Sequence, residues 1–163
     1  MNIANLKKDE IIKMHYFKCQ HGHTGLAHPQ CYLETRGEKE RLGFLDIETT
    51  GLRADYGFML SYCIKSNDGT LLSGLINPKH IHAGLLDKEL VSKAVVDIKK
   101  FDRIFTYYGA RFDIPFLRTR SLYWGLEFPN YKELKHTDVY DVAKRKLCLR
   151  SKRLGVVCDL FKI

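Results

Sequence analysis

The segment from Gly43 to Glu48 combines a short apolar strand pattern with two acidic residues. Its first five residues, GFLDI, are mostly apolar and lie between turn-forming residues, which is typical of a buried strand. Asp46 and Glu48 stand two positions apart, so a strand would place both carboxylates on one face, about 7 Å apart along the chain. Two like charges on a buried strand are costly unless a cation neutralises them. The alternative is an exposed strand end at which water solvates both groups.

The pattern after this strand predicts an α/β domain. Asn67-Asp68-Gly69 is a strong hairpin signal between two further strands. The expected order is three meandering strands followed by helix, strand and helix, which predicts a mixed sheet with helices packed on it. The fourth strand is expected in the middle of the sheet. The elements expected after the first strand are Met59 to Lys65, Leu71 to Ile76, Lys88 to Lys100, Arg103 to Tyr107, Asp113 to Tyr123, Val139 to Lys146 and Lys152 to Phe161.

A second segment that can carry chemistry runs from Tyr107 to Arg120, with the sequence YYGARFDIPFLRTR. Asp113 stands at the predicted start of a helix, where a lone aspartate usually serves as an N-cap. Gly109 permits an unusual backbone turn after the fourth strand. Arg118 and Arg120 lie one to two turns further on, where they either reach a phosphate or face solvent.

Both segments match the motifs of a known family. DIETTGL, from Asp46 to Leu52, resembles the first exonuclease motif of the DEDD family of 3′–5′ exonucleases. YYGARFDIPFLRTR resembles the second, whose usual form reads Y-N-G-x-x-F-D-x-P-F-L-x-x-R, and the spacing between the two also suits the family. The resemblance covers roughly Leu42 to Ile163 and is to the exonuclease domains of family-B DNA polymerases and their stand-alone relatives. It implies a ribonuclease H-like fold, a mixed sheet flanked by helices.

The resemblance also implies a function, the metal-dependent 3′–5′ hydrolysis of phosphodiester bonds in nucleic acid. Asp46, Glu48 and Asp113 would be the catalytic carboxylates and would bind two divalent cations, Mg²⁺ or Mn²⁺. One cation would activate water and the other would stabilise the leaving 3′-oxygen, with the two about 4 Å apart. Phe116 is expected in the core. The residues expected near the 3′-terminal nucleotide are Thr49, Leu52, Tyr108 and Phe112, with core filling as the alternative for the apolar ones.

The sequence departs from the family pattern in two places. Tyr108 stands where the second motif usually has Asn, which contacts substrate or water in relatives. The family also uses a fourth carboxylate from a third motif, Tyr-x-x-x-Asp or His-x-x-x-x-Asp, and neither follows RLGVVCDLFKI before Ile163. Asp138 and Asp141 come too early to supply it. Two hypotheses follow: an exonuclease domain truncated at its C-terminus, and a catalytically incomplete nucleic-acid-binding module with a structural zinc site.

A second candidate metal site lies in the segment CQHGHTGLAHPQC, from Cys19 to Cys31. Cys19, His23, His28 and Cys31 form a Cys₂His₂ set with spacings like those of structural zinc sites. His21 is the competing ligand in place of His23. The alternative is a flexible His-rich loop with two free thiols. We expect zinc, closing a segment that is too small to bury a core of its own.

The charged connector TRGEKER, from Thr35 to Arg41, predicts a domain boundary. Before it lies the N-terminal His- and Cys-rich appendage, residues 1–41, which resembles a zinc knuckle. After it lies the ribonuclease H-like exonuclease domain, residues 42–163.

The charge balance suits an anionic partner. Lys and Arg number 27 against 19 acidic residues, a formal net charge of +8, which fits nucleic acid or an acidic membrane surface. Together with the motifs, this favours nucleic acid, in the form of single-stranded 3′ ends, as the partner. Tyr107, Tyr108, Tyr123 and Trp124 could stack on bases. A C-terminal basic cluster that could contact phosphates comprises Lys144, Arg145, Lys146, Arg150, Lys152 and Arg153.

The sequence shows no sign of a membrane segment or of a disulfide framework. No apolar run approaches the roughly 20 residues of a membrane span, and Met1 to Glu10 lacks the apolar centre of a signal peptide. The protein is therefore expected to be intracellular, cytoplasmic or nucleoid-associated, without a membrane partner. Five cysteines, an odd number, argue against a disulfide framework in a reducing compartment. Cys63, Cys148 and Cys158 have apolar neighbours and are predicted as small core residues.

Overall fold

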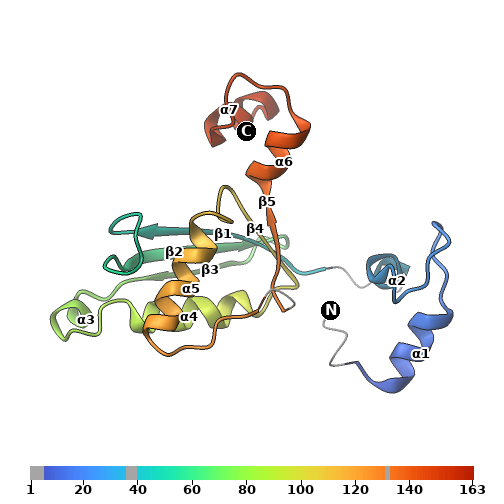
Figure 1. Cartoon of the computed structure of the whole chain (residues 1–163), viewed down its shortest axis with the longest axis horizontal. Coiled ribbons are helices and arrows are strands. Elements are labelled where there is room, and N and C mark those ends of the chain that lie inside the picture. Colours follow the sequence, from blue (N-terminus) through green and yellow to red (C-terminus); the bar gives the residue numbers. More distant parts are fainter. Residues whose placement is uncertain (1–5, 36–39, 131–132) are drawn as a thin grey trace. The chain divides into compact units, whose positions relative to one another are not determined.

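The computed structural model describes residues 6–35, 40–130 and 133–163. The chain divides into two compact units, Met1–Arg41 and Leu42–Ile163. Figure 1 shows the helices and strands of each unit, coloured along the sequence. Part of the predicted connector, residues 36–39, lies outside the described residues. Within the described ranges, no helix is long and apolar enough to cross a lipid bilayer.

The N-terminal unit contains two helices, α1 (Lys8–Tyr16) and α2 (Pro29–Thr35). From the sequence, Lys8 to Met14 is expected to form a short helix or strand, and the structure forms a helix there. The second helix was not predicted, although Pro29 at its first position is a common helix-starting signal, because the missing N–H removes no helical hydrogen bond there.

The core of this unit is small. Met14, Tyr32 and Leu33 are its buried large side chains, and the Phe17 ring packs edge-on against Tyr32 with 5.2 Å between ring centroids. The Tyr32 hydroxyl also donates a hydrogen bond of 3.1 Å to Glu10. So few apolar contacts give little stability by themselves, and small domains of this kind commonly need a metal or another covalent or ionic constraint.

The larger unit is built on a five-stranded mixed sheet, which confirms the predicted fold class. The strand order is β3-β2-β1-β4-β5. The first three strands pair antiparallel, as the hairpin signal predicted, whereas β4 runs parallel to β1 and β5 runs parallel to β4. The strands are β1 (Leu42–Thr49), β2 (Met59–Ser66), β3 (Leu71–Leu75), β4 (Arg103–Thr106) and β5 (Lys135–Asp138).

The fourth predicted strand lies inside the sheet, between β1 and β5. The fifth strand escaped the sequence analysis because its four residues, KHTD, contain no apolar side chain. Pairing with β4 rather than intrinsic strand preference makes this segment extended. The helices of the unit are α3 (Pro78–His82), α4 (Lys88–Ile98), α5 (Asp113–Tyr123), α6 (Val139–Lys146) and α7 (Leu154–Phe161).

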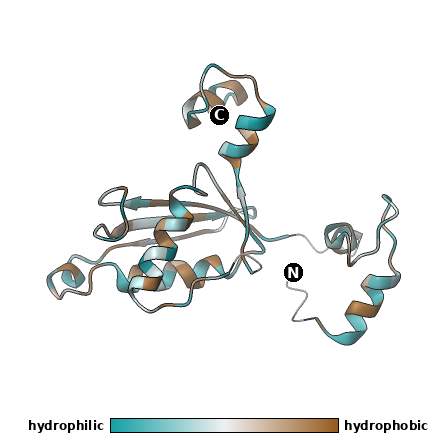
Figure 2. Ribbon diagram, viewed as in Figure 1, coloured by the Kyte–Doolittle hydropathy of each residue, from teal (hydrophilic) through white to brown (hydrophobic). Residues whose placement is uncertain are grey.

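One face of the sheet forms the core with helices α4 and α5. Along β1, residues alternate between buried and exposed, so that Leu45 and Ile47 face the helices while Asp46 and Glu48 face the other way. Apolar and polar positions alternate along α4 in Figure 2, as expected for a helix with one buried side. The remaining core side chains come mainly from β2, β4, α4 and α5: Tyr62, Ile64, Ile104, Leu90, Val91, Ala94, Val95, Ile98, Ile114, Phe116 and Leu117.

Of two predictions about buried side chains, one is confirmed and the other is wrong. Phe116 is buried in the core, as predicted. The three cysteines predicted as core residues are not fully buried: Cys63 and Cys158 are half-buried and Cys148 is exposed. Apolar neighbours in sequence are poor guides to burial when a segment presents them to different sides.

A buried ion pair joins the helices to the start of β2. Arg120 on α5 is 2% exposed and pairs with the fully buried Asp87, with 2.6 Å between Nη2 and Oδ1. The same carboxylate accepts hydrogen bonds from the Trp124 indole and the Met59 backbone N–H, both at 2.8 Å. Arg120 therefore neither reaches a phosphate nor faces solvent, contrary to the prediction. The arginine that ends the second motif orders the core.

We predict that Arg120→Met lowers the free energy of unfolding by about 3 kcal/mol or more, because it leaves the Asp87 carboxylate buried without its cation. Urea unfolding of the whole chain measures this. Arg145→Met removes an exposed arginine from α6 and is the matched control, with an expected change below about 0.5 kcal/mol. Equal losses for the two variants would contradict a structural role of the Asp87–Arg120 pair.

Candidate active site and candidate metal centre

The acidic pair of the first motif lies on the exposed face of β1. Asp46 and Glu48 are both exposed and share that face with Phe44, as period-two geometry predicted. The pairing of β1 with β2 shifts in register between Glu48 and Thr49. Such irregularities re-aim side chains at strand ends and are common near functional sites.

Asp113 meets this strand from the other motif. The parallel pairing of β4 with β1 stops at Phe44, so the next part of that edge is open to other hydrogen-bond partners. The Asp113 carboxylate, at the first position of α5, accepts the Ile47 N–H at 3.2 Å. The side chain is only 4% exposed. The two motifs, 66 positions apart at this contact, are thus joined by a carboxylate that bonds to the strand carrying Asp46.

Burial and neighbouring negative charge raise the pKa values of Asp46 and Asp113. Burial and then the neighbouring Asp46 raise the pKa of Asp113 to about 6. Burial and then Glu48 raise the pKa of Asp46. Like charges that are held together and partly removed from water are the condition under which a cation binds favourably. The donor set therefore fits hard divalent cations, which prefer carboxylate oxygens.

These three carboxylates are less tightly gathered than the ligands of a closed metal site. Among the described residues, the group whose ligand atoms all lie within 4.8 Å of one another is Cys19, His21, His28 and Cys31. The structure thus brings Asp46 next to Glu48 and Asp113 without closing the three around one point. Their assignment as metal ligands stays a prediction.

The turn between β4 and α5 is shaped by two unusual residues. A Cβ on Gly109 would lie 2.4 Å from the Thr106 hydroxyl and 2.7 Å from the Asp113 carboxylate, so a larger residue would displace the acid. Tyr108 has a φ of 68°, in the left-handed region, where a bulky residue costs about 1 to 2 kcal/mol. Asn, which the second motif usually has here, adopts this conformation more readily. The departure from the family pattern therefore has a backbone cost.

Asp138 fixes that turn, a role that the sequence analysis did not foresee. It is the N-cap of α6 and accepts the Tyr140 N–H at 3.0 Å. It also accepts the N–H groups of Tyr108 at 2.8 Å and Ala110 at 3.0 Å. The signal in the sequence was an aspartate directly before a predicted helix, but its partners 30 residues away come from the fold. Asp141, in turn, pairs with Arg111 at 3.0 Å.

The four residues predicted near a 3′-terminal nucleotide surround this region unevenly. Thr49 donates its hydroxyl hydrogen to the Gly51 carbonyl at 2.8 Å, and Leu52 on the following turn is 83% exposed. Tyr108 is 47% exposed, whereas Phe112 is half-buried with its ring 5.7 Å from that of Phe116. Exposed Leu52 and Tyr108 are not needed for the core, which leaves them available to a ligand.

The Cys–His cluster of the N-terminal unit has the geometry of a tetrahedral site. The Cys31 sulfur lies 3.3 Å from His28 Nδ1 and 3.6 Å from His21 Nδ1. The Cys19 sulfur lies 3.6 Å and 3.8 Å from the same two nitrogens. A tetrahedral zinc ion separates sulfur and nitrogen ligands by about 3.6 Å. The cluster is therefore consistent with a zinc knuckle.

The fourth member of the cluster is His21, the residue left as the alternative to His23. The turn explains this, because Gly22, with a φ of 80°, donates its N–H to the Cys19 carbonyl at 2.8 Å and bends the chain back. His28 directly precedes α2, and Cys31 lies in its first turn. The His23 ring lies 5.3 Å from that of His28 and remains near the cluster.

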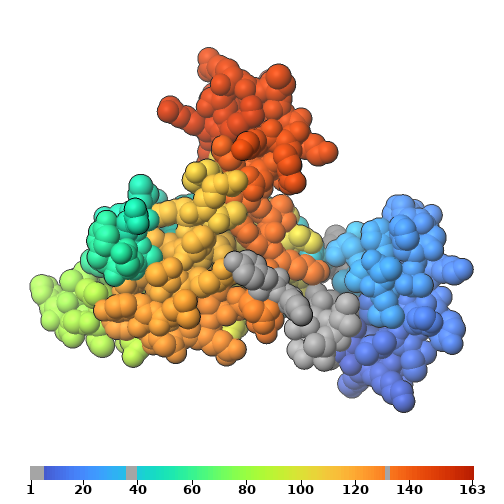
Figure 3. Space-filling model, in the orientation of Figure 1, coloured from blue at the N-terminus to red at the C-terminus, as the bar shows by residue number. Residues whose placement is uncertain are grey.

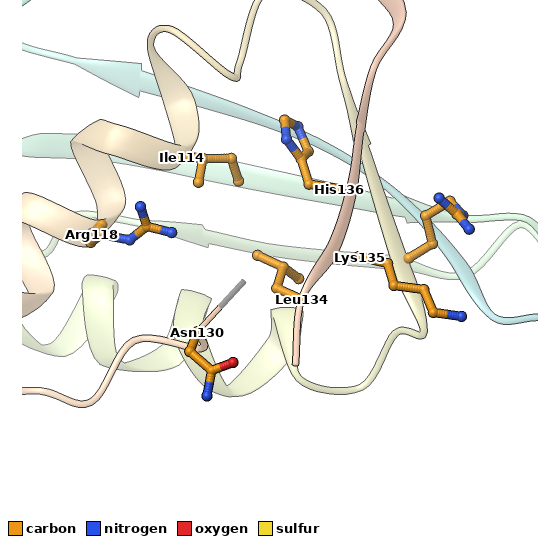
Figure 4. Close-up of a pocket in the computed structure, with 7 residues that line it drawn as sticks. Ile114, Arg118, Asn130, Leu134, Lys135 and His136 are labelled. Carbon is orange, nitrogen blue, oxygen red and sulfur yellow. The ribbon is translucent and has the colours of Figure 1, made fainter. Parts of the chain in front are cut away.

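Arg118, the other arginine of the second motif, lines a hollow of about 430 Å³ beside β5. Figure 4 shows its guanidinium on α5, with Leu134 and His136 across the hollow. The other lining residues are Arg103, Ile114, Asn130 and Lys135. This hollow includes neither Asp46 nor Asp113, so Arg118 is not part of the carboxylate site.

Comparisons with known proteins agree with the fold and with the motifs. The family described as the RNase_H superfamily matches residues 43–162. A DNA polymerase from Methanocaldococcus jannaschii is 32% identical over 97 residues, covering 47% of this chain and 6% of the polymerase. The chain thus spans only a small part of that relative.

Solved structures share the fold at low sequence identity. The family B DNA polymerase from Pyrobaculum calidifontis has a TM-score of 0.63 and 19% identity, over 76% of this chain and 18% of the polymerase. The zinc-bound form of the E. coli exonuclease I–ssDNA complex has a TM-score of 0.60 and 15% identity, over 74% of this chain and 35% of exonuclease I. The predicted resemblance to DEDD exonucleases is confirmed at the level of the fold. From the family match over most of its length, this chain belongs to the RNase H superfamily.

Proposed function

We propose that this protein is a metal-dependent 3′–5′ exonuclease that hydrolyses phosphodiester bonds of nucleic acid. The observation that carries the proposal is the contact between the two motifs, in which buried Asp113 bonds to the strand that bears Asp46 and Glu48. Burial and then Asp46 raise the pKa of Asp113, so the charged carboxylate is disfavoured until a cation binds beside it. Carboxylates with pKa values shifted in this way are common at functional sites.

In this proposal the three carboxylates would hold the cations from two elements. Asp46 and Glu48 would bind them from the exposed face of β1, and Asp113 would bind them from the start of α5. When bound, Mg²⁺ or Mn²⁺ supplies the positive charge that activates water and stabilises the leaving 3′-oxygen. Asp113 is fixed by the Ile47 N–H, so its free oxygen keeps one orientation. Gly109 leaves room for that oxygen.

The 3′-terminal nucleotide would lie between the turn after β1 and the turn after β4. Leu52 is exposed on the first turn and would pack against a base, while Thr49 and Phe112 would lie beside the nucleotide. Tyr108 replaces the usual amide with an aromatic ring that can stack or donate a hydrogen bond. Substrates with unpaired 3′ ends suit such a site, because the terminal base must leave its partner.

The alternative is a catalytically incomplete nucleic-acid-binding module with a structural zinc site. It is favoured by Tyr108, which stands where the second motif usually has Asn. Asp138 and Asp141 do not add ligands to the three carboxylates, because one caps α6 and the other pairs with Arg111. This hypothesis expects salt-sensitive binding of oligonucleotides without cleavage.

In either case zinc would hold the N-terminal unit together. Desolvation and then the neighbouring Cys19 thiol raise the pKa of the Cys31 thiol in the metal-free cluster. A cation between the two sulfurs would favour both thiolates and contribute folding energy to a unit with a small core.

We predict that Asp46→Asn lowers Mn²⁺-dependent release of mononucleotides from a 5′-labelled single-stranded oligonucleotide by at least about a hundredfold, because the substitution removes a metal-binding charge. Gel electrophoresis of time points measures the release. Asp159→Asn, an exposed carboxylate on α7, is the matched control and should leave the rate unchanged. An unaltered rate in Asp46→Asn would refute the assignment, and binding without any release by the unsubstituted chain would favour the alternative.

We predict a pH dependence of stability that belongs to Asp113. Its pKa in the folded, metal-free protein is about 6, above the value near 4 of the unfolded chain. The folded state therefore binds the extra proton between these values, and this stabilisation is lost as the pH rises from about 4 to about 6. Urea unfolding at several pH values should show the unsubstituted protein falling relative to Asp113→Asn over this range. Parallel pH profiles would contradict the raised pKa.

We predict that the protein binds one zinc ion through Cys19, His21, His28 and Cys31. Elemental analysis of the purified protein should give one zinc per chain, and Cys31→Ser should lose it while the control Cys148→Ser keeps it. His21→Ala should also lose zinc, whereas His23→Ala should retain it. The reverse result for the two histidines would restore His23 as the ligand.

A further inference from the structure

A groove of about 550 Å³ lies between the turn after β4 and the segment that joins α6 to α7. Three tyrosines and a basic segment line it: Tyr107, Tyr108, Tyr140, Arg150, Ser151, Lys152, Arg153 and Leu154. Figure 3 shows the golden surface of the β4–α5 turn next to the orange-red surface of the C-terminal part of the chain. We call this feature the tyrosine–arginine groove.

Hydrogen bonds hold the two walls of the groove together. The Tyr107 hydroxyl donates to the Lys152 carbonyl, which ties the basic segment to the end of β4. Asp138 accepts the backbone N–H groups of Tyr108 and Tyr140, so one carboxylate holds the backbone of both tyrosines in place. Hydrogen bonds within the protein therefore define the shape of the groove.

The three tyrosine rings of the groove form a cluster in which Tyr108 is the exposed ring. Tyr140 meets Tyr108 edge-on with 4.9 Å between ring centroids, and meets Tyr107 edge-on at 5.9 Å. Arg111 covers Tyr108 and Tyr140, at 5.5 Å and 5.6 Å from their ring centroids. Tyr108 nevertheless stays 47% exposed, in a left-handed conformation that is costly for a tyrosine. An exposed, oriented ring of this kind is available for stacking.

The positive charges of Arg150 and Arg153 are not neutralised within the part of the protein that the structure describes. Arg150 and Arg153 are exposed, and neither forms an ion pair with any residue that the structure describes. Lys152 donates to the Leu149 carbonyl at 2.8 Å, which is a neutral partner. By contrast, Arg111 behind the tyrosines is neutralised by Asp141. The groove thus presents net positive charge beside aromatic rings.

We propose that the tyrosine–arginine groove binds single-stranded nucleic acid, with Arg150 and Arg153 on phosphates and Tyr108 against a base. Stacking rings beside cationic side chains are how proteins hold single strands, whereas the base faces of a duplex are closed to stacking. The placement of the 3′ end at the carboxylates rests on the proposed function. Tyr108 is the neighbour of Gly109, at which a Cβ would lie 2.7 Å from the Asp113 carboxylate. A strand whose 3′ end lies at the carboxylates would then continue through the groove.

The experiment is fluorescence anisotropy of a labelled single-stranded 12-mer, across a salt series, with the full chain carrying Asp46→Asn to prevent degradation. Adding Arg150→Ala and Arg153→Ala should make the negative slope of log K against log salt shallower by about 1.4, because two phosphate contacts on a single strand are lost. Binding should weaken by about twentyfold at 0.1 M salt. The matched control, Lys79→Ala with Lys99→Ala, removes two exposed charges that lie outside the groove and outside the C-terminal basic cluster. Circular dichroism verifies that the variants fold.

The control pair should change the slope by much less than the groove pair, and the groove pair should weaken binding of a blunt duplex less than that of the single strand. Photo-crosslinking of a 5-iodouracil oligonucleotide should label the peptides that contain Tyr108 or Tyr140. Equal losses from both pairs, or crosslinks confined to other peptides, overturn the inference.

The same protein variants and oligonucleotides distinguish failure of the groove proposal from failure of the proposed exonuclease activity. Groove-dependent binding by a chain that releases no nucleotides with Mn²⁺ supports the groove and counts against the exonuclease. Mn²⁺-dependent release by the chain with Asp46 intact, combined with unchanged binding in the groove variant, supports the exonuclease and overturns the groove.

Discussion

The hydrogen bond from the Ile47 N–H to Asp113 is the contact on which the site depends. It exists because β4 stops pairing with β1 at Phe44, which leaves the next part of that strand edge open. The carboxylate that fills this position is buried and lies near Asp46, so satisfying the backbone creates a concentration of negative charge. A cation would relieve that charge, which links a local structural need to the proposed chemistry.

Acidic residues serve two opposite purposes in the larger unit. Asp87 and Asp138 are buried and fully satisfied, the first by Arg120, Trp124 and a backbone N–H, the second by three backbone N–H groups. They hold helix to sheet and turn to helix. Asp113 instead lies near Asp46, and burial and then the Asp46 charge raise the pKa of Asp113. The structural carboxylates have hydrogen-bond donors on both oxygens, whereas Asp113 has another carboxylate as a neighbour.

The sequence predicted much of this accurately, for identifiable reasons. Short apolar runs and the Asn67-Asp68-Gly69 turn predicted the first three strands, and helical periodicity predicted α4. Strand β5 was missed because KHTD has no apolar pattern and is extended through its pairing with β4. Arg120 was misjudged because its partner, Asp87, lies 33 positions away. The exchange of His23 for His21 likewise follows from a turn geometry that residue spacing does not specify.

By itself, the sequence determined the fold class and the family, because these follow from periodicity and from short motifs read along the chain. The tertiary structure decided which side chains meet. It turned Arg120 inward, made Asp138 the anchor of the Tyr108 turn, and brought Arg150 and Arg153 beside three tyrosines. These outcomes depend on contacts between residues about 30 or more positions apart, and such contacts are set by the packing of the sheet and helices rather than by local sequence.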